Sequence, residues 1–334
     1  MDTSNPTEKQ HFVPRFYLRN FSDSNGLIRV LDVPNKRIGK PRPYQSVGYS
    51  KFFYAAKTGV SDKISQDVEE WLKVFENYIA RGLPKIINAI DGLQHIEDDD
   101  RYFLSVFISM LWLRAPGMRD QLNKMHEDLL KQTMKINVPR GIERYLKETG
   151  KKWSPEEIEK IMKVVESGNY DVRFNNIDHL RFMVETLGYN KPGFANMFFG
   201  MKWKIYLLRS KEIFITTDSP IVEKWFPPKT AYGDGCSFLE RTKYFALTPK
   251  ILIELTYPCG TKKVKRETLF EGQSEIVKMF NIILMSGCQE FVYSGDDDCL
   301  GQLLSGIEKP GLLERAYMEK YEKPWAEYRR RIGR

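Results

Sequence analysis

The sequence predicts a mixed α+β fold in which a helical body packs against a mostly antiparallel β-sheet. Apolar residues recur mostly at helical spacing between about residues 60 and 200. Residues 27–56 and 202–293 instead hold short runs rich in β-branched and aromatic residues, which is typical of strands. No Gly-, Ser- or Pro-rich linker marks a boundary, which leaves one large domain or two closely packed ones. We take the first, a single domain over residues 1–334.

The composition is that of a globular protein with a moderate excess of positive charge. The 334 residues include 52 Lys and Arg and 44 Asp and Glu, for a net charge of +8, and the pI is about 9.1. This balance is compatible with nucleic acid or another anionic ligand, although many proteins without such a partner share it. The longest apolar run, residues 102–113, is too short to span a bilayer, so we expect no membrane partner.

The cysteines exclude the common zinc motifs. No two of them form a C-x-x-C pair, and the sequence shows no signal peptide, so we expect reduced thiols in the cytoplasm. The metal dependence and the oligomeric state stay open. The four cysteines are Cys236, Cys259, Cys288 and Cys299.

The first distinctive stretch is residues 11–21, with the sequence HFVPRFYLRNF. Pro14 suits a first helical turn, because the N–H that proline lacks would have no partner there. A helix that begins at Pro14 places Tyr17 and Phe21 on one face. After a polar turn, residues 27–33 alternate in a way that predicts a strand.

The helical body is predicted from caps and apolar spacing. A helix capped by Ser61 or Asp62 is expected to break at Gly82-Leu83-Pro84, with a short helix continuing to Ile90. Residues 98–114 begin with three Asp and are then apolar nearly all round, which predicts a buried central helix. Pro116-Gly117 should end or kink it.

A more polar helix is expected to follow, to about Lys135. Ser154-Pro155-Glu156-Glu157 predicts another helix start, with an N-cap serine and a glutamate at the third helical position. Residues 136–175 are otherwise polar, so we expect an inserted, exposed hairpin of helices there. A further helix is expected over residues 177–187.

The second half of the chain is predicted to form most of the sheet. Residues 203–208 and 212–216 favour a hairpin that runs into Thr217-Asp218-Ser219-Pro220. The remaining elements are strands over 244–247, 251–256 and 290–293 and helices over 275–285 and 311–332.

No common catalytic signature is present: there is no Walker A sequence, no G-x-G-x-x-G after a strand, no H-E-x-x-H and no G-x-S-x-G. The first candidate cluster is His11 with Arg15 and Tyr17. His11 stands before a predicted helix N-terminus, where anions are favoured. The cluster is either an acid/base imidazole beside an anion-binding arginine or a histidine that caps a structural helix.

The second candidate cluster is the turn after residues 212–216. A strand end delivers Asp218 between the hydroxyls of Thr217 and Ser219, and strand ends commonly carry sites. The alternative is an Asx or ST turn in which Asp218 bonds its own backbone.

The third cluster is Arg114 with Arg119, on either side of the break after the central helix. A buried arginine must be paired or bind an anion. Arg114 therefore either forms a salt bridge, to Asp218 or one of Asp98–Asp100, or binds phosphate. The basic clusters at residues 262–266 and 329–331 favour solvated faces over nucleic-acid contact.

These stretches resemble the motifs of the family called domain of unknown function 4238. Its H-x-V-P-x-x-Y-L-x-x-F signature is matched in full by residues 11–21, and its R-x-P by Arg114 and Pro116. Its T-S-D-x-P corresponds to residues 216–220, with Thr217 in place of the usual serine, and its L-T-P to residues 247–249. The resemblance implies a mostly bacterial, cytoplasmic protein and supplies no activity.

Residue chemistry therefore carries the functional hypothesis. We expect a hydrolase for a phosphodiester or other anionic substrate, with His11 as general acid or base. Asp218 would orient His11 or hold a divalent ion, and Arg15 and Arg114 would bind the anion. Further substrate contacts are assigned to Tyr17, Thr217 and Ser219. The alternative is a non-catalytic protein that binds nucleic acid or a protein partner.

Overall fold

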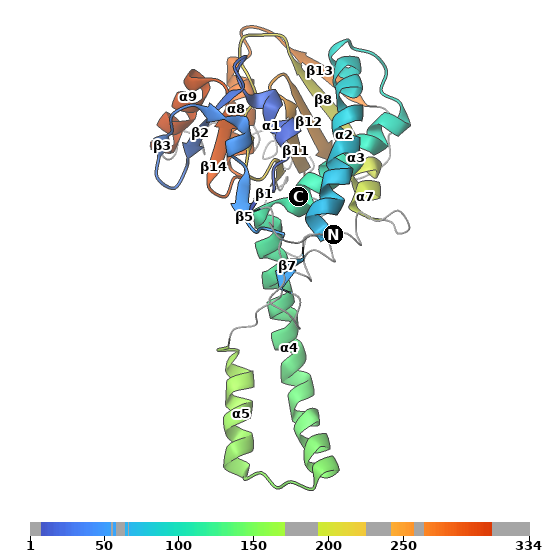
Figure 1. The fold of residues 1–334 in the computed structure, drawn as a ribbon, viewed down its shortest axis with the longest axis vertical. Helices are drawn as coiled ribbons and strands as arrows, with labels where there is room; N and C mark the ends of the chain where they lie inside the picture. Colours follow the sequence, from blue (N-terminus) through green and yellow to red (C-terminus); the bar gives the residue numbers. More distant parts are fainter. Residues whose placement is uncertain are drawn as a thin grey trace, which may run out of the picture.

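The computed structural model describes residues 8–54, 56–57, 64–65, 67–170, 193–224, 242–256 and 264–308. Its body contains two five-stranded sheets with helices packed around them, and a long pair of helices projects away from the body (Figure 1). This architecture confirms the predicted mixed α+β fold with mostly antiparallel sheets.

The sheet with the longer strands has the order β10-β11-β12-β8-β13. It is antiparallel except for the parallel pair of β13 and β8. Its strands β8, β11 and β12 are almost wholly buried, as continuous apolar runs require. The predicted strands around Thr248-Pro249 are confirmed. The bounds are Lys202–Leu208 for β8, Ile221–Lys224 for β10, Thr242–Thr248 for β11, Ile251–Thr256 for β12 and Lys265–Leu269 for β13.

The second sheet brings together the beginning and the end of the described chain. Its order is β3-β2-β14-β9, with β4 also paired to β2. Two short ribbons, β1 with β5 and β6 with β7, complete the strands of the described residues. The bounds are Lys9–His11 for β1, Leu27–Asp32 for β2, Arg37–Ile38 for β3, Arg42–Pro43 for β4, Tyr49–Lys51 for β5, Ala56–Lys57 for β6, Ile64–Ser65 for β7, Thr216–Thr217 for β9 and Phe291–Ser294 for β14.

Helix α3 lies at the centre of the helical layer, as its apolar sequence predicted. Eleven of its seventeen residues are buried, and it packs on α7 and α2. Helices α8 and α9, which come from the C-terminal part of the described chain, pack on the two sheets (Figure 1). The bounds are Arg15–Leu18 for α1, with a 3₁₀ turn over Arg19–Phe21, a second 3₁₀ turn over Tyr44–Ser46, Asp67–Asp91 for α2, Asp98–Arg114 for α3, Phe194–Gly200 for α7, Ser274–Met285 for α8 and Asp297–Glu308 for α9.

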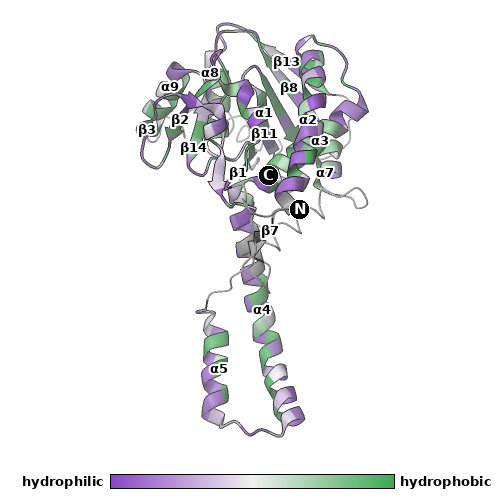
Figure 2. Cartoon of the chain, in the orientation of Figure 1, coloured by the Kyte–Doolittle hydropathy of each residue, from purple (hydrophilic) through white to green (hydrophobic). Residues whose placement is uncertain are grey.

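Helices α4 (Pro116–Thr149) and α5 (Pro155–Ser167) form the projecting arm. Purple and green alternate along both helices in Figure 2, and many of their residues are exposed. The capping box of Ser154 and Glu157 is present at the start of α5, as predicted. A pair of helices with many exposed residues is present, but it begins at Pro116 and not near residue 136, and residues 171–175 of the expected insertion lie outside the described residues. The expected end near Lys135 is wrong, because α4 continues through Pro139.

The predicted break at Pro84 is also wrong, because α2 is continuous from Asp67 to Asp91. Ile79, Leu83 and Ile86 are buried at helical spacing on both sides of the proline. Gly82 allows a close approach to α3, since a Cβ there would lie 2.6 Å from the Phe103 ring. Burial of this apolar stripe outweighs the roughly 3 kcal/mol that an interior proline costs.

The predicted hairpin of residues 203–208 and 212–216 does not form. After β8 the chain crosses to the second sheet, where β9 pairs with β14. The Asn281 side chain on α8 accepts from the Ile215 N–H and donates to the Ile213 carbonyl. A side chain distant in sequence therefore satisfies the backbone that a hairpin partner would have bonded.

Several predictions fall outside the described residues: Cys236 and Cys259, the helices over 177–187 and 311–332, and most of the two basic clusters. In the part of the chain that the structure describes, every helix is too short or too polar to traverse a lipid bilayer.

Candidate functional site

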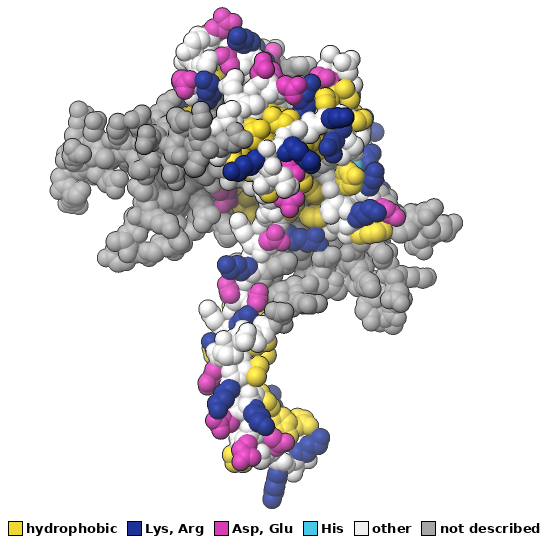
Figure 3. All heavy atoms as spheres, turned by 90° about the vertical axis from the view of Figure 1, so that its left-hand side faces the viewer, with side chains coloured by type: hydrophobic (Ala, Val, Ile, Leu, Met, Phe, Trp, Pro, Cys, Tyr) yellow, Lys and Arg dark blue, Asp and Glu magenta, His cyan; other side chains and the backbone are white. Residues whose placement is uncertain are grey.

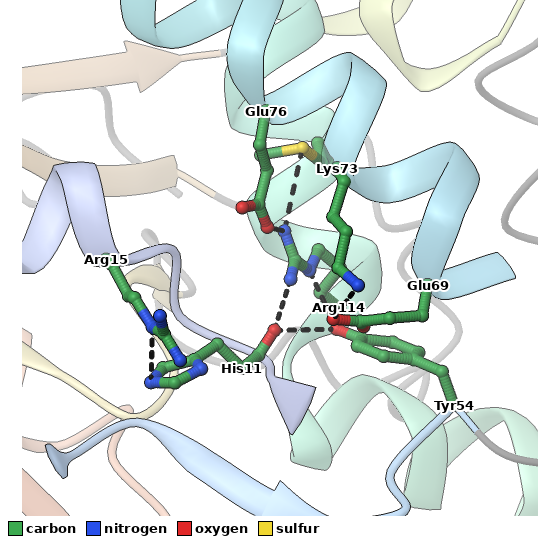
Figure 4. A network of polar contacts seen from close by, with 8 residues as sticks. His11, Arg15, Tyr54, Glu69, Lys73, Glu76 and Arg114 are labelled. Carbon is green, nitrogen blue, oxygen red and sulfur yellow. Dashed lines mark hydrogen bonds and ion pairs between the residues drawn. The ribbon is translucent and has the colours of Figure 1, made fainter. Parts of the chain in front are cut away.

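Arg114, at the end of α3, is the centre of a buried polar network (Figure 4). Its side chain is 1% exposed. Nε donates to the Tyr54 hydroxyl at 2.7 Å, one terminal nitrogen lies 2.5 Å from the Glu76 carboxylate, and the other donates to the His11 carbonyl. The guanidinium thus joins β1, α2 and α3. The expected salt bridge exists, with Glu76 as partner rather than Asp218 or Asp98–Asp100.

Burial and charge together shift the pKa values of the network. Burial disfavours the charge on Arg114, but Tyr54 and Glu76 outweigh it and keep the pKa of Arg114 above its ordinary value. Burial raises the pKa of Tyr54 to about 12, against the opposing effect of Arg114. Glu69, which lies 3.9 Å from Lys73, also has a raised pKa because it is buried. Arg114 and the Tyr54 hydroxyl both donate to the His11 carbonyl, and through these bonds β1 is held against the helical layer.

The His11 ring points away from Arg114, toward Arg15 (Figure 4). Its Nε2 lies 3.1 Å from the Gln45 carbonyl oxygen and 3.4 Å from Nε of Arg15. A neutral ring has one N–H, so the shorter contact favours Nε2–H donating to the carbonyl. Burial first, and then the Arg15 charge, lower the pKa of His11 to about 4. The imidazole is therefore neutral at pH 7, and its ring centroid lies 5.4 Å from that of Tyr49.

Tyr17 connects the opening helix to both sheets. Its side chain is fully buried, and its hydroxyl donates to the Ala246 carbonyl at 2.6 Å and lies 2.8 Å from Oγ1 of Thr216. One donor and one acceptor position are thus in use. These contacts describe a packing role, and the predicted contact with substrate stays a prediction.

Asp218 organises the start of β14. Its carboxylate accepts three backbone N–H bonds, from Gln289 at 2.8 Å, Glu290 at 2.7 Å and Phe291 at 2.9 Å. Burial nevertheless raises the pKa of Asp218. Before it, the Thr217 hydroxyl accepts from the Ser219 N–H at 3.1 Å, so a turn is present but Thr217 closes it, whereas Asp218 bonds the distant backbone of β14 and not its own as expected. The Ser219 hydroxyl is buried and has no partner among the described residues.

The three predicted clusters do meet, but through other atoms than the sequence suggested. Tyr17 bonds Thr216, and Arg114 bonds the backbone of His11. No hydrogen bond or ion pair within the described residues joins the His11 ring to the Asp218 carboxylate. The imidazole–carboxylate pair therefore stays a prediction. Across those same residues, no three His, Cys, Asp or Glu side chains gather to hold a metal ion.

A basic segment, residues 9–51, is the feature that our sequence reasoning missed, and we call the surface to which it contributes the basic face. This segment holds nine Lys and Arg and two Asp, a net charge of +7 from a chain total of +8. Figure 3 looks onto the side of the molecule where β3 and β5 lie. It shows Lys and Arg side chains around an apolar patch, with a few acidic side chains among them. A charge count in sliding windows would have found this segment.

A pocket of about 230 Å³ opens in the basic face. The Tyr49 side chain, next to the His11 ring, forms part of its wall. The segments that build it are far apart in the sequence, so no local motif marks it. Its lining residues are Phe12, Val30, Arg42, Ser46, Val47, Gly48, Tyr49, Phe291 and Tyr293.

Comparison with known proteins identifies a family. The family described as protein of unknown function (DUF4238) matches residues 9–298, which include all the motifs discussed above. No match was found among curated proteins or among solved structures. Since the match covers most of the chain, the protein belongs to the DUF4238 family.

Proposed function

We propose that this protein binds nucleic acid through the basic face formed by residues 9–51. The observation that carries the proposal is the concentration of seven of the eight net positive charges in this one segment. Phosphate backbones are bound by such clusters of Lys and Arg, largely without regard to sequence.

The arrangement of the cations supports a ligand rather than a structural role. Lys9 and Lys51 lie directly opposite each other across the β1–β5 ribbon. Like charges in that position destabilise a strand pair, and an anion bound there would offset the cost. Glu8 lies 3.3 Å from Lys51 and offsets part of it.

Several cations of this face also lack acidic neighbours. No carboxylate oxygen of a described residue lies within 4.0 Å of the charged nitrogens of Lys9, Arg37, Lys40 or Arg42, all of which are exposed. Arg29 is different, because it pairs with Asp297. Exposed cations without a carboxylate partner are available for phosphate oxygens.

The test is a titration of fluorescently labelled nucleic acid with the full chain at several salt concentrations. The triple variant Lys9→Gln, Arg37→Gln, Lys40→Gln should weaken binding. The slope of log K against log salt should shrink by about 2 units for a single strand, at ~0.7 per lost phosphate contact. A matched control, Lys135→Gln, Lys147→Gln, Lys152→Gln, removes three exposed charges from the arm.

The control should leave affinity and slope unchanged. Equal losses in both triple variants would show that only net charge matters, and absence of binding at low salt would remove the proposal.

A second proposal, hydrolysis of the bound phosphodiester, is supported by the neutral His11 imidazole beside Arg15. A neutral imidazole can accept a proton, and the guanidinium can stabilise charge on phosphate. Replacing His11 with Asn should abolish phosphodiesterase activity and leave binding intact. Unchanged turnover would exclude His11 as the general base.

A further inference from the structure

We propose that the pocket in the basic face takes one unstacked nucleobase, so that the ligand is a single-stranded nucleic acid. This inference rests on the proposed nucleic-acid binding and adds the kind of strand that is bound. A duplex keeps its bases stacked inside the helix and presents none to such a pocket.

The size and the walls of the pocket suit a flat aromatic ring. Its volume of about 230 Å³ is below the range of roughly 300–1,000 Å³ typical of drug-sized ligands. Four of its nine lining residues are aromatic, and two of these, Tyr49 and Phe291, are partly exposed. Aromatic side chains beside a cationic groove are the usual platform for bases of single strands.

Polar and cationic groups at the pocket complement a nucleotide. Arg42 and Ser46 are the lining residues with polar side chains other than tyrosine. The Ser46 hydroxyl donates to the Pro43 carbonyl at 2.7 Å, which leaves its oxygen free to accept from a base. Lys9 Nζ lies over one face of the Tyr49 ring, 5.2 Å from its centre, so a base packed against the rest of that ring would have its phosphate near a cation.

The signature segment of the family holds this pocket in shape. The Gly48 carbonyl accepts from the N–H groups of Phe12 and Val13. Gly48 has φ +68°, and a Cβ there would lie 3.0 Å from the Leu18 side chain and 3.1 Å from that of Val13. Only glycine combines this left-handed backbone with so close an approach. The motif segment therefore fixes the backbone at Gly48, which lines the pocket, and contributes Phe12 to the wall, so the wall is preorganised for its ligand.

The experiment compares three labelled or competing polyanions with the full chain: a single strand of about 12 nucleotides, the duplex of the same sequence, and inorganic polyphosphate. The wild type should prefer the single strand. Tyr49→Ala should weaken binding of the single strand about tenfold and leave the duplex, polyphosphate and the salt slope unchanged. Tyr49→Phe keeps the stacking ring and should retain wild-type affinity.

The outcomes separate this inference from the one it rests on. Equal wild-type affinity for single strand, duplex and polyphosphate would overturn the base pocket and leave electrostatic nucleic-acid binding standing. No binding to any of the three would overturn both. A loss in Tyr49→Ala that is equal for all three ligands would also reject the pocket, and thermal melts of both variants will show whether each is folded.

Discussion

Replacing Arg114 with Met tests whether the buried network stabilises the fold. The substitution keeps an unbranched chain of similar length but leaves the Tyr54 hydroxyl and the Glu76 carboxylate without the Arg114 donor, and the His11 carbonyl keeps the Tyr54 hydroxyl, at 3.3 Å, as a donor. Breaking a buried ion pair by removing one partner typically costs about 3–5 kcal/mol. The Glu76 side chain is 24% exposed and can be hydrated in part, so we expect a loss near the lower end, about 3 kcal/mol.

Urea unfolding followed by tryptophan fluorescence measures this loss. Arg114→Lys keeps the charge but lacks the planar guanidinium that reaches three acceptors. Its free energy of unfolding should therefore lie between those of the wild type and Arg114→Met. Glu76→Gln provides a double-mutant cycle, in which we expect a coupling energy of about 1–3 kcal/mol. A loss below about 0.5 kcal/mol in Arg114→Met, the range of ordinary surface changes, would refute the structural role.

Three further outcomes follow from the contacts. The pKa of His11 is about 4 in the folded protein, below its ordinary 6.5, because the fold favours the neutral imidazole. The contribution of this neutral ring to the free energy of unfolding is therefore complete above pH 6.5. The free energy of unfolding, measured by urea titration, should fall by up to about 3 kcal/mol as the pH is lowered from 6.5 to 4. His11→Asn should remove this pH dependence. Tyr17→Phe should lower the free energy of unfolding by about 1–3 kcal/mol, because the buried Ala246 carbonyl loses its donor. In the same assay, the double variant Tyr17→Phe, Thr216→Val should lose less than the sum of the two single losses, because the two hydroxyls contact each other. Ser154→Ala should cost about 1 kcal/mol and raise hydrogen exchange in α5 while the body is unchanged.

Local signals predicted the elements whose causes are local. The apolar run of α3, the capping box at Ser154 and the strands around Thr248-Pro249 all have their determinants within a few residues. The continuity of α2 through Pro84 and the crossing of the chain after β8 depend on packing against distant helices. No periodicity within either segment contains that information.

In the candidate site, too, the features with local causes were predictable and those that depend on distant residues were not. The motifs around His11, Arg114 and Asp218 were found in the sequence, but their partners were not. Glu76 is 38 residues from Arg114, and the N–H groups bound by Asp218 are 71 to 73 residues away. Residue type indicated that these groups needed partners, and only the folded chain shows which ones.

Ultraviolet cross-linking of a single-stranded oligonucleotide to the full chain, followed by mass spectrometry of the cross-linked peptides, tests nucleic-acid binding by the basic face most directly. We expect the cross-links in residues 9–51 and 291–294, with Tyr49 and Phe291 as the modified side chains. Cross-links confined to other parts of the chain, such as the α4–α5 arm, would contradict the assignment of the binding face.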